Sequence, residues 1–251
     1  MRYFFVSDIH GEFDALVKAL TDANFNAAAD TLVVVGDSFD RGNKSRQVLE
    51  FILQCPNRIL IWGNHDLRLQ EICHDVWRYD WHDGQNGVLK TIKSILGKNR
   101  TDNTWDDLAA LNNNMRLRRY FNECVLCAEW PDYIAVHAWL PHYKNKLMPK
   151  EEWTRFDWKE ATWAHTENCI KEKMFPEKKL IIGHWHAWRL REFMGGFKYT
   201  KADDVDVSTF ETEHFIALDG CTNYSKKVNV FIYETDVAPI LTSMQDIVNI
   251  A

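Results

Sequence analysis

The chain has 251 residues, of which 46% are hydrophobic and 26% are charged. This composition excludes wholesale disorder and allows a sizeable core in one large domain or two small ones. The net charge of −6 argues against stable nucleic-acid binding, which needs a basic stripe. The six cysteines, the absence of a signal peptide and the lack of an apolar stretch of ~20 residues predict a reduced, cytoplasmic protein with no membrane partner.

Strands and helices are expected to alternate over the first 62 residues. The run 32–35 contains only Leu and Val, which is typical of a strand buried on both faces. Strands are predicted at 3–7, 32–35 and 58–62, and helices at about 13–20 and 45–54. This order indicates an α/β sheet with its functional site beyond the carboxyl ends of the strands.

The remainder of the chain is expected to add a helical segment and a second set of strands. We interpret residues from about 66 to 118 as a helical insert or cap over the site. A Trp-rich stretch at 153–174 is also predicted to be helical. Strand-like runs lie at 124–129, 133–137, 179–183, 214–219 and 228–234. With no repeat or linker between them, residues 1–251 are predicted to form a single domain with two sheet layers.

Five short segments rich in Asp, His and Asn each lie next to an apolar run. They are 7–11 (SDIHG), 36–42 (GDSFDRG), 63–66 (GNHD), 136–138 (VHA) and 183–186 (GHWH). Oxygen and nitrogen donors of these types suit Mn, Fe, Zn or Mg rather than soft metals. Because side chains alternate along a strand, Asp8 and His10 are expected to point the same way, as are His184 and His186.

The donor types predict a phosphate-cleaving site with two metals. Two cations roughly 3.5–4 Å apart can hold a shared hydroxide and clamp phosphate oxygens during in-line attack. Asp37 could bridge the two cations, and His65 could protonate a leaving alkoxide. Asp40 could hold the imidazole of His65 in its charged form, because a nearby carboxylate raises a histidine pKa. Arg41 could grip phosphate oxygens in a bidentate fork.

These segments resemble the GDxHG, GDxxDRG, GNHD, HAG and GH motifs of calcineurin-like metallophosphoesterases. The resemblance is to the branch of phosphoprotein phosphatases and bacterial diadenosine tetraphosphatases, and it continues weakly into 218–221 (LDGC). It implies a four-layer α-β-β-α sandwich with two central mixed β-sheets. It also implies that one metal is bound by Asp8, His10 and Asp37, and the other by Asp37, Asn64, His137 and His184. The roles of His65, Asp40 and Arg41 in that family agree with the chemistry above, and the broader GHxH pattern makes His186 a further candidate ligand.

Several positions depart from the pattern of that family. Trp139 stands where Gly is usual, and Trp62 and His165 stand where protein phosphatases carry phosphate-gripping arginines. Arg189 or Arg191 could substitute for them. The chain has eleven tryptophans, which are either core residues or, for one or two of them such as Trp139, rings that stack on a base in the substrate site.

The sequence therefore predicts a dinuclear metal-dependent phosphoesterase in which a metal-bridging hydroxide attacks phosphorus directly. Two divalent metal ions are expected, with Mn preferred and Fe, Zn or Mg as alternatives. The first interpretation is a Ser/Thr-protein-phosphatase-like phosphomonoesterase, and the alternative is a dinucleoside polyphosphate (Ap4A-type) hydrolase. A metal-free binding protein on a degenerate phosphatase scaffold is the alternative from another class. The expected partner is a phosphorylated substrate: a phosphoprotein, a nucleotide or a small phosphate ester.

Overall fold

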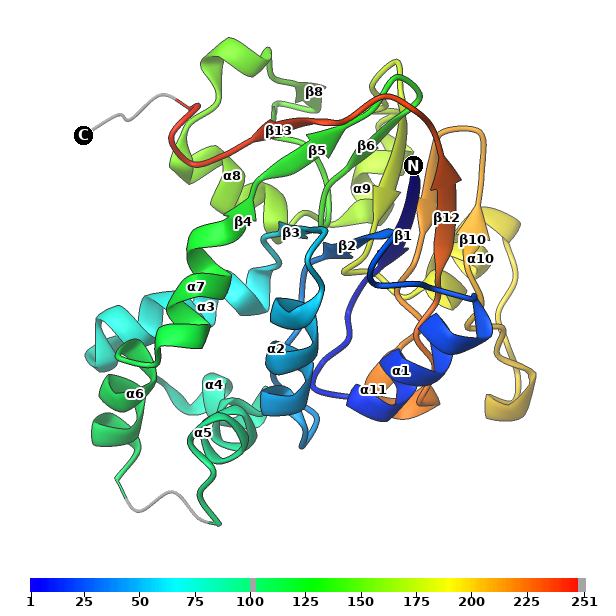
Figure 1. Ribbon diagram of the computed structural model, residues 1–251. Coiled ribbons are helices and arrows are strands. Elements are labelled where there is room, and N and C mark those ends of the chain that lie inside the picture. The colour runs from blue at the N-terminus through cyan, green and yellow to red at the C-terminus, as the bar shows by residue number, and fades with distance from the viewer. Residues whose placement is uncertain (100–102, 248–251) are drawn as a thin grey trace.

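A computed structural model describes residues 1–99 and 103–247. Two β-sheets lie at the centre of the molecule, with helices on their outer faces (Figure 1). The first sheet has the strand order β12-β1-β2-β3-β4, and the second has the order β10-β11-β9-β6-β5-β13. Each sheet contains parallel and antiparallel pairs. The predicted four-layer sandwich with two central mixed sheets is confirmed.

The first sheet is built from the alternation that the sequence indicated. Its parallel core strands are β1 (Arg2–Val6), β2 (Thr31–Val35) and β3 (Arg58–Ile61), followed by the short β4 (Cys124–Val125). β12 (Phe231–Glu234) adds to β1 in antiparallel orientation. The crossover helices are α1 (Phe13–Asp22) and α2 (Ser45–Gln54). The carboxyl ends of β1, β2 and β3 therefore lie at the same edge of the sheet.

The second sheet supplies the other half of the sandwich. Its parallel members are β6 (Tyr133–Ala135), β9 (Lys179–Ile182) and β11 (Phe215–Ala217). The antiparallel members are β5 (Cys127–Glu129), β10 (Phe210–Glu211) and β13 (Ile240–Thr242). Helices α8 (Arg155–Thr162), α9 (Thr166–Lys171) and α10 (Ala187–Gly195) accompany it. The short pair β7 (His142–Tyr143) and β8 (Lys146–Leu147) forms a separate hairpin.

Strand alternation divides the core into a layer between the sheets and layers beneath the helices. Tyr3 and Phe5 pack into the cluster that also holds Trp130 and Ile181 from the second sheet. Phe4 and the other alternate residues of β1 belong instead to the cluster that contains the apolar sides of α1 and α2. Each sheet is thus buried on both faces, which explains why its strands read as unbroken apolar runs.

A mainly helical segment lies between β3 and β4, two neighbouring strands of the first sheet. It comprises α3 (Asn64–His74), a 3-10 turn (Val76–Arg78), α4 (Trp81–Gln85), α5 (Val88–Leu96), α6 (Thr104–Asn112) and α7 (Met115–Glu123). These helices gather at one end of the molecule, as the cyan to green ribbon of Figure 1 shows. The helical character predicted for this segment is confirmed over its described residues. No helix in the described part of the chain is long and apolar enough to span a membrane.

Candidate two-metal site

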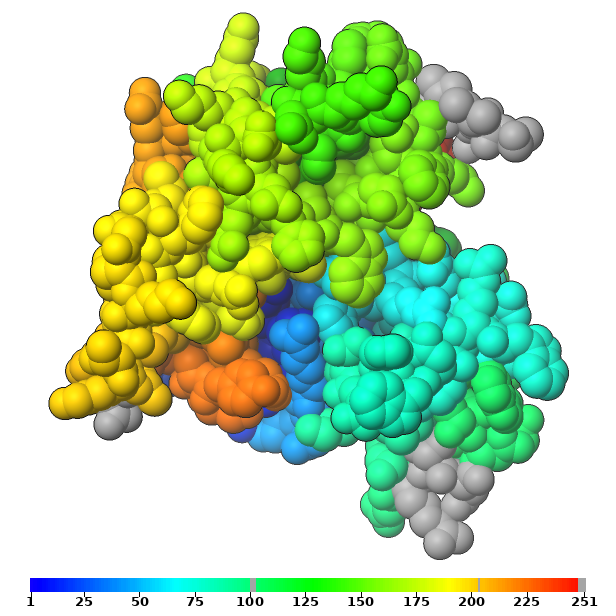
Figure 2. All heavy atoms as spheres, turned by 180° about the vertical axis from the view of Figure 1, so that it is seen from behind, coloured from blue at the N-terminus to red at the C-terminus, as the bar shows by residue number. Residues whose placement is uncertain are grey.

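The predicted ligands converge where the central strands end. β1, β2, β3 and β9 stop shortly before Asp8, Asp37, Asn64 and His184, respectively. Seen from behind, the blue N-terminal segment lies at the bottom of a hollow between the cyan helical segment and the yellow-green segment that carries α8 and α9 (Figure 2). Asp8, Asp37 and Asn64 are almost fully buried. The site therefore lies at the carboxyl ends of the strands, as the α/β alternation predicted.

Left-handed backbone turns, not strand alternation, aim these side chains. β1 ends at Val6, and Asp8 and His10 follow it with φ angles of +49° and +48°. Asp37 and His184 also have positive φ angles, of +55° and +64°. Strand alternation was therefore the wrong reason to expect Asp8 and His10 to point the same way, because neither residue lies in the strand. Each left-handed non-glycine residue costs about 1–3 kcal/mol, so surrounding contacts must hold these turns in place.

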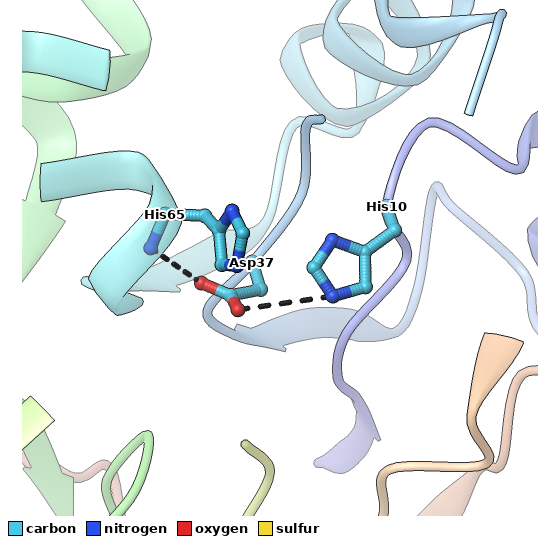
Figure 3. Close-up of side chains that lie close together, drawn as sticks. All are labelled: His10, Asp37 and His65. Atoms are coloured by element: carbon cyan, nitrogen blue, oxygen red, sulfur yellow. Dashed lines mark hydrogen bonds and ion pairs between the residues drawn. The ribbon is translucent and has the colours of Figure 1, made fainter. Parts of the chain in front are cut away.

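His10 offers an imidazole nitrogen that faces two carboxylates and bonds to neither. Its Nδ1 donates to the carbonyl oxygen of Phe39 at 3.0 Å, which leaves Nε2 as the unprotonated nitrogen. That buried Nε2 has no hydrogen-bond partner. It lies 3.9 Å from Asp8 Oδ1 and 3.8 Å from Asp37 Oδ2, the latter drawn in Figure 3. Burial and the charge of Arg41 lower the pKa of His10 to about 3, so the ring is neutral and can act as a ligand.

A second group of donors surrounds the side-chain oxygen of Asn64. His137 donates from Nδ1 to the carbonyl oxygen of Val35 at 2.9 Å, and its Nε2 lies 2.9 Å from Asn64 Oδ1 and 3.5 Å from Asp37 Oδ2. His184 Nδ1 lies 3.0 Å from the same amide oxygen. Asp37, His137 and His184 form one group whose ligand atoms lie within 4.8 Å of one another. Asp37 thus takes part in both groups, as a bridging carboxylate would.

The acidic side chains of the site raise the pKa of two candidate ligands, Asp8 and His137. Burial and the neighbouring carboxylates of Asp219 and Asp37 raise the pKa of Asp8 to about 8. Burial alone would lower the pKa of His137, but Asp37 and Asp8 outweigh it and raise the value to about 10. The orphaned nitrogen of His10, the carboxylates and the neutral amide oxygen together fit two divalent cations.

His65 is held between an acid and a guanidinium. Its backbone N–H donates to Asp37 Oδ1 at 3.0 Å (Figure 3), and its Nδ1 donates to Asp40 Oδ2 at 3.0 Å. Arg41 donates to His65 Nε2 at 3.1 Å. A guanidinium can only donate, so the ring is neutral in this arrangement. Burial would lower the pKa of His65, but Asp37 and Asp40 outweigh it and raise the value. Arg41 must therefore leave Nε2 before the ring can carry a second proton.

His65 also lies within ligand distance of His10 and Asp37. Its two ring nitrogens are already engaged by Asp40 and Arg41, however, whereas the Nε2 of His10 has no partner. The contacts of His65 match a proton-carrying group better than a ligand. The structure thus joins Asp40, His65 and Arg41 in one hydrogen-bond network. Their roles in catalysis stay predictions.

Two buried residues that the sequence did not single out support this network. Asp66, the last residue of the GNHD motif, accepts the backbone N–H groups of Asp37 at 2.8 Å and of Ser38 and Gly63 at 3.2 Å. It therefore ties the loop after β2 to the start of α3. Its position in the motif was visible in the sequence, but its three main-chain partners follow only from the fold.

Thr91 on α5 holds Asp40 from the other side. Its hydroxyl donates to Asp40 Oδ1 and accepts from the backbone N–H of Asp40, both at 2.9 Å. Gly87, with φ +96°, lies so close to the chain that an added Cβ would stand 2.3 Å from the nitrogen of Arg41. Lys90 Nζ donates to the carbonyl oxygen of Arg41 at 2.7 Å. The helical segment thus fixes the strained turn at Asp40 and Arg41, whose φ angles are +67° and +58°.

His186 lies apart from both ligand groups. Its Nδ1 is 2.8 Å from Asp219 Oδ2, and its Nε2 is 3.5 Å from the sulfur of Cys221. Burial would lower the pKa of His186, but its hydrogen bonds to Asp219 and Cys221 raise the value to about 10. The structure does not bring its ring nitrogens to those of His10 or His184, so its role as a ligand stays a prediction. Asp219 comes from the 218–221 segment that weakly resembled the family.

The aromatic and arginine candidates near the motifs have different positions. Trp139 is fully buried, donates from Nε1 to the carbonyl oxygen of Met174 at 2.9 Å, and does not line the site. Of the two interpretations of Trp139, core packing agrees with its burial, and stacking on a substrate base does not. Arg189 stacks on Trp185 with its guanidinium 4.9 Å from the ring centre. Arg191 is held away by Asp206 at 3.2 Å.

Trp163, at the end of α8, has a ring that reaches the site. Its side chain is about half exposed. Its ring stands edge-on to that of His184, with 6.3 Å between the centroids. A cavity of about 300 Å³ lies beside it, and Asn64 and His65 form part of the wall. The cavity and the two ligand groups are therefore neighbours.

The chain belongs to the calcineurin-like phosphoesterase family, whose sequence model matches residues 1–189. That match spans all five motif segments. Among solved structures, a candidate diadenosine tetraphosphatase aligns with 96% of this chain and 93% of its own, at a TM-score of 0.55 and 17% identity. A cold-active protein-tyrosine phosphatase from a psychrophilic Shewanella aligns with 94% of this chain and 76% of its own, at a TM-score of 0.53 and 12% identity. At such identities, these likenesses show the shared fold alone.

Curated relatives are more similar in sequence over shorter stretches. A symmetrical bis(5'-nucleosyl)-tetraphosphatase of Vibrio vulnificus is 30% identical over 139 residues, which is 55% of this chain and 44% of that protein. One of Buchnera aphidicola is 39% identical over 92 residues, which is 36% of this chain and 33% of that protein. The chain thus spans less than half of the length of either relative.

Proposed function

We propose that this protein is a metal-dependent hydrolase of dinucleoside polyphosphates. The proposal is carried by one observation: a buried ligand set fit for two divalent cations occurs in a chain similar to symmetrical bis(5'-nucleosyl)-tetraphosphatases. The motifs alone favoured a Ser/Thr-type phosphomonoesterase. The similarity in sequence supports the alternative instead, and so does the lack of the phosphatase arginines at Trp62 and His165.

Divalent cations, of which Mn is expected and Fe, Zn or Mg are alternatives, would offset phosphate charge and activate water at this site. One would be held by Asp8, His10 and Asp37. The other would be held by Asp37, Asn64, His137 and His184. Asp8, His10, Asp37 and His184 lie in left-handed turns after strands, and Asn64 begins α3. The ligand set is therefore organised before substrate arrives.

Arg41 and His65 act in sequence when a phosphate enters. The planar guanidinium of Arg41 can exchange its bond to His65 Nε2 for two bonds to phosphate oxygens, which are stronger because both partners are charged. Nε2 is then free to hold a proton, and Asp40 stabilises the resulting imidazolium through Nδ1. His65 delivers that proton to the leaving oxygen.

The leaving group distinguishes the two phosphoesterase functions. A phosphoanhydride releases a nucleoside phosphate, whose oxygen is a far weaker base than the alkoxide released from a phosphoserine. The weaker base needs less protonation in the transition state, so loss of the general acid costs less. Replacement of His65 should therefore reduce hydrolysis of an alkyl phosphate more than hydrolysis of a dinucleoside tetraphosphate.

A substrate panel with the Mn-loaded protein tests the proposal. Diadenosine tetraphosphate, a phosphoserine peptide, a nucleoside monophosphate and a phosphodiester would be compared by kcat/KM, with products separated by chromatography. We expect the dinucleoside to be the best substrate and to yield nucleoside diphosphate alone, as symmetrical cleavage requires. A preference for the phosphopeptide would contradict the proposal. Protein purified without chelator that holds no metal and cleaves nothing would instead indicate a binding protein on a degenerate scaffold.

A further inference from the structure

Within the proposed dinucleoside polyphosphatase activity, we propose that the cavity beside Trp163 is the subsite for an uncharged nucleoside. The cavity is bounded by α3, α4 and the end of α8, and Asp40, Asn64 and His65 form its inner wall. Its volume of about 300 Å³ is at the lower end for small-molecule sites. It is therefore sized for one nucleoside rather than for a folded peptide.

The charges in the cavity exclude the polyphosphate chain from it. Among the described lining residues, Asp40, Glu71, Asp80 and Asp83 are acidic, and Arg68 and Lys159 are the basic ones besides the histidines. Both cations are already paired. Arg68 donates to both carboxylate oxygens of Asp83 at 2.8 Å, and Lys159 contacts Glu71 at 2.6 Å. A phosphate would thus meet excess negative charge here, whereas divalent cations held by the neighbouring ligand groups would attract it.

Trp163 offers the apolar surface that a base needs. Its ring is 47% exposed, although its neighbours Thr162 and Ala164 are buried. Trp163 is the C-cap residue of α8, and a capping box between Thr154 and Asp157 begins that helix. A base stacked on this ring would lie beside His184, within one nucleotide of the ligand group. Stacking on an exposed indole accepts any base, and Asn86 and His82, which also line the cavity, carry polar groups that can bond to the edge of a base.

Equilibrium binding to the Mn-loaded protein tests this assignment. The two probes are a methylene-bridged, non-hydrolysable diadenosine tetraphosphate and inorganic tripolyphosphate, which has no base. The variants are Trp163→Ala, Trp163→Phe and the control Trp77→Ala, whose ring is more exposed and packs against Trp105 instead. We expect Trp163→Ala to lower the affinity for the dinucleoside by about tenfold, as the loss of one base stack predicts. The affinity for tripolyphosphate should not change.

Trp163→Phe should retain most of the affinity, because a smaller ring still stacks, and Trp77→Ala should behave as the natural protein. Equal weakening of both probes by Trp163→Ala would reveal a structural role and overturn the inference, as would an unchanged affinity for the dinucleoside. If the natural protein binds tripolyphosphate but not the dinucleoside, the proposal of a nucleoside subsite is overturned. If it cleaves phosphopeptides in preference to dinucleosides, the proposed function fails and the subsite with it.

Discussion

The two sides of the site are built on different principles. On the ligand side, main-chain carbonyl groups orient the imidazoles: Phe39 holds His10, and Val35 holds His137. On the proton-transfer side, side chains from the helical segment hold the reacting groups, and Thr91 clamps Asp40. The ligand side therefore depends on the strand β2 and the loops that follow β1 and β2, whereas the other side depends on how the helices pack. The two functions should be separable by mutation.

The largest effect is expected at the residue shared by the two metal groups. Asp37→Asn removes the charge that both groups use, while the shape of the side chain is preserved. We expect kcat/KM to fall by at least about a thousandfold, because this change affects both cations. Metal analysis of the purified variant should show loss of metal as well. Full metal content with near-normal turnover would contradict the bridging role of Asp37.

Loss of the proton donor should leave the ligand side intact. His65→Asn is expected to reduce kcat on an alkyl phosphate by about 10²–10⁴-fold, the usual contribution of general acid catalysis. Metal content should match that of the natural protein, since the ring nitrogens of His65 are engaged by Asp40 and Arg41. Metal loss in this variant would show instead that His65 is a ligand.

Metal affinity should rise with pH through protons that the ligands must release. In the metal-free protein the pKa of Asp8 is raised to about 8 and that of His137 to about 10, so both hold a proton at pH 7. Metal requires both ligands to be deprotonated. The apparent affinity should therefore increase by about tenfold per pH unit for each proton displaced, and it should weaken as pH falls below 8. Calorimetric Mn titrations at pH 6, 7 and 8 measure the slope, and a flat profile would contradict it.

A smaller effect is expected where the helical segment touches the reacting groups. Thr91→Val keeps the shape of the side chain but removes both hydrogen bonds to Asp40. We expect kcat to fall by about tenfold with KM and metal content unchanged, which is the cost of leaving buried polar groups unpaired. Thr91→Ser restores the hydroxyl and should restore kcat. A raised KM together with lower metal content and a lower melting temperature would indicate general damage to the fold rather than a positioning role for Thr91.

Local sequence patterns predicted the arrangement of the candidate ligands more completely than the contacts of the candidate proton-transfer residues. Asp8, Asp37 and Asn64 directly follow apolar runs, and parallel strands bring such positions to one edge. The left-handed turns at Asp8 and His10 could not be inferred from alternation, because the strand ends earlier than the motif.

The other side depends on contacts between distant segments. Thr91 lies 51 positions after Asp40 in a helix with an ordinary amphipathic pattern, and nothing local marks it as a partner. Nothing in the sequence around Gly87 indicates its close approach to the backbone of Arg41 either. Likewise, the sequence could not tell that Trp139 enters the core while Trp163 faces the cavity, because packing alone decides the burial of a ring.

The central claim is that two cations held by this ligand set carry the hydrolysis of dinucleoside polyphosphates. The most direct test is to titrate the metal-stripped protein with Mn while recording bound metal and the rate of diadenosine tetraphosphate cleavage together. We predict that activity appears as the second equivalent binds and that nucleoside diphosphate is the sole nucleotide product. Full activity without bound metal, or two bound equivalents with no cleavage of this substrate, would contradict the claim.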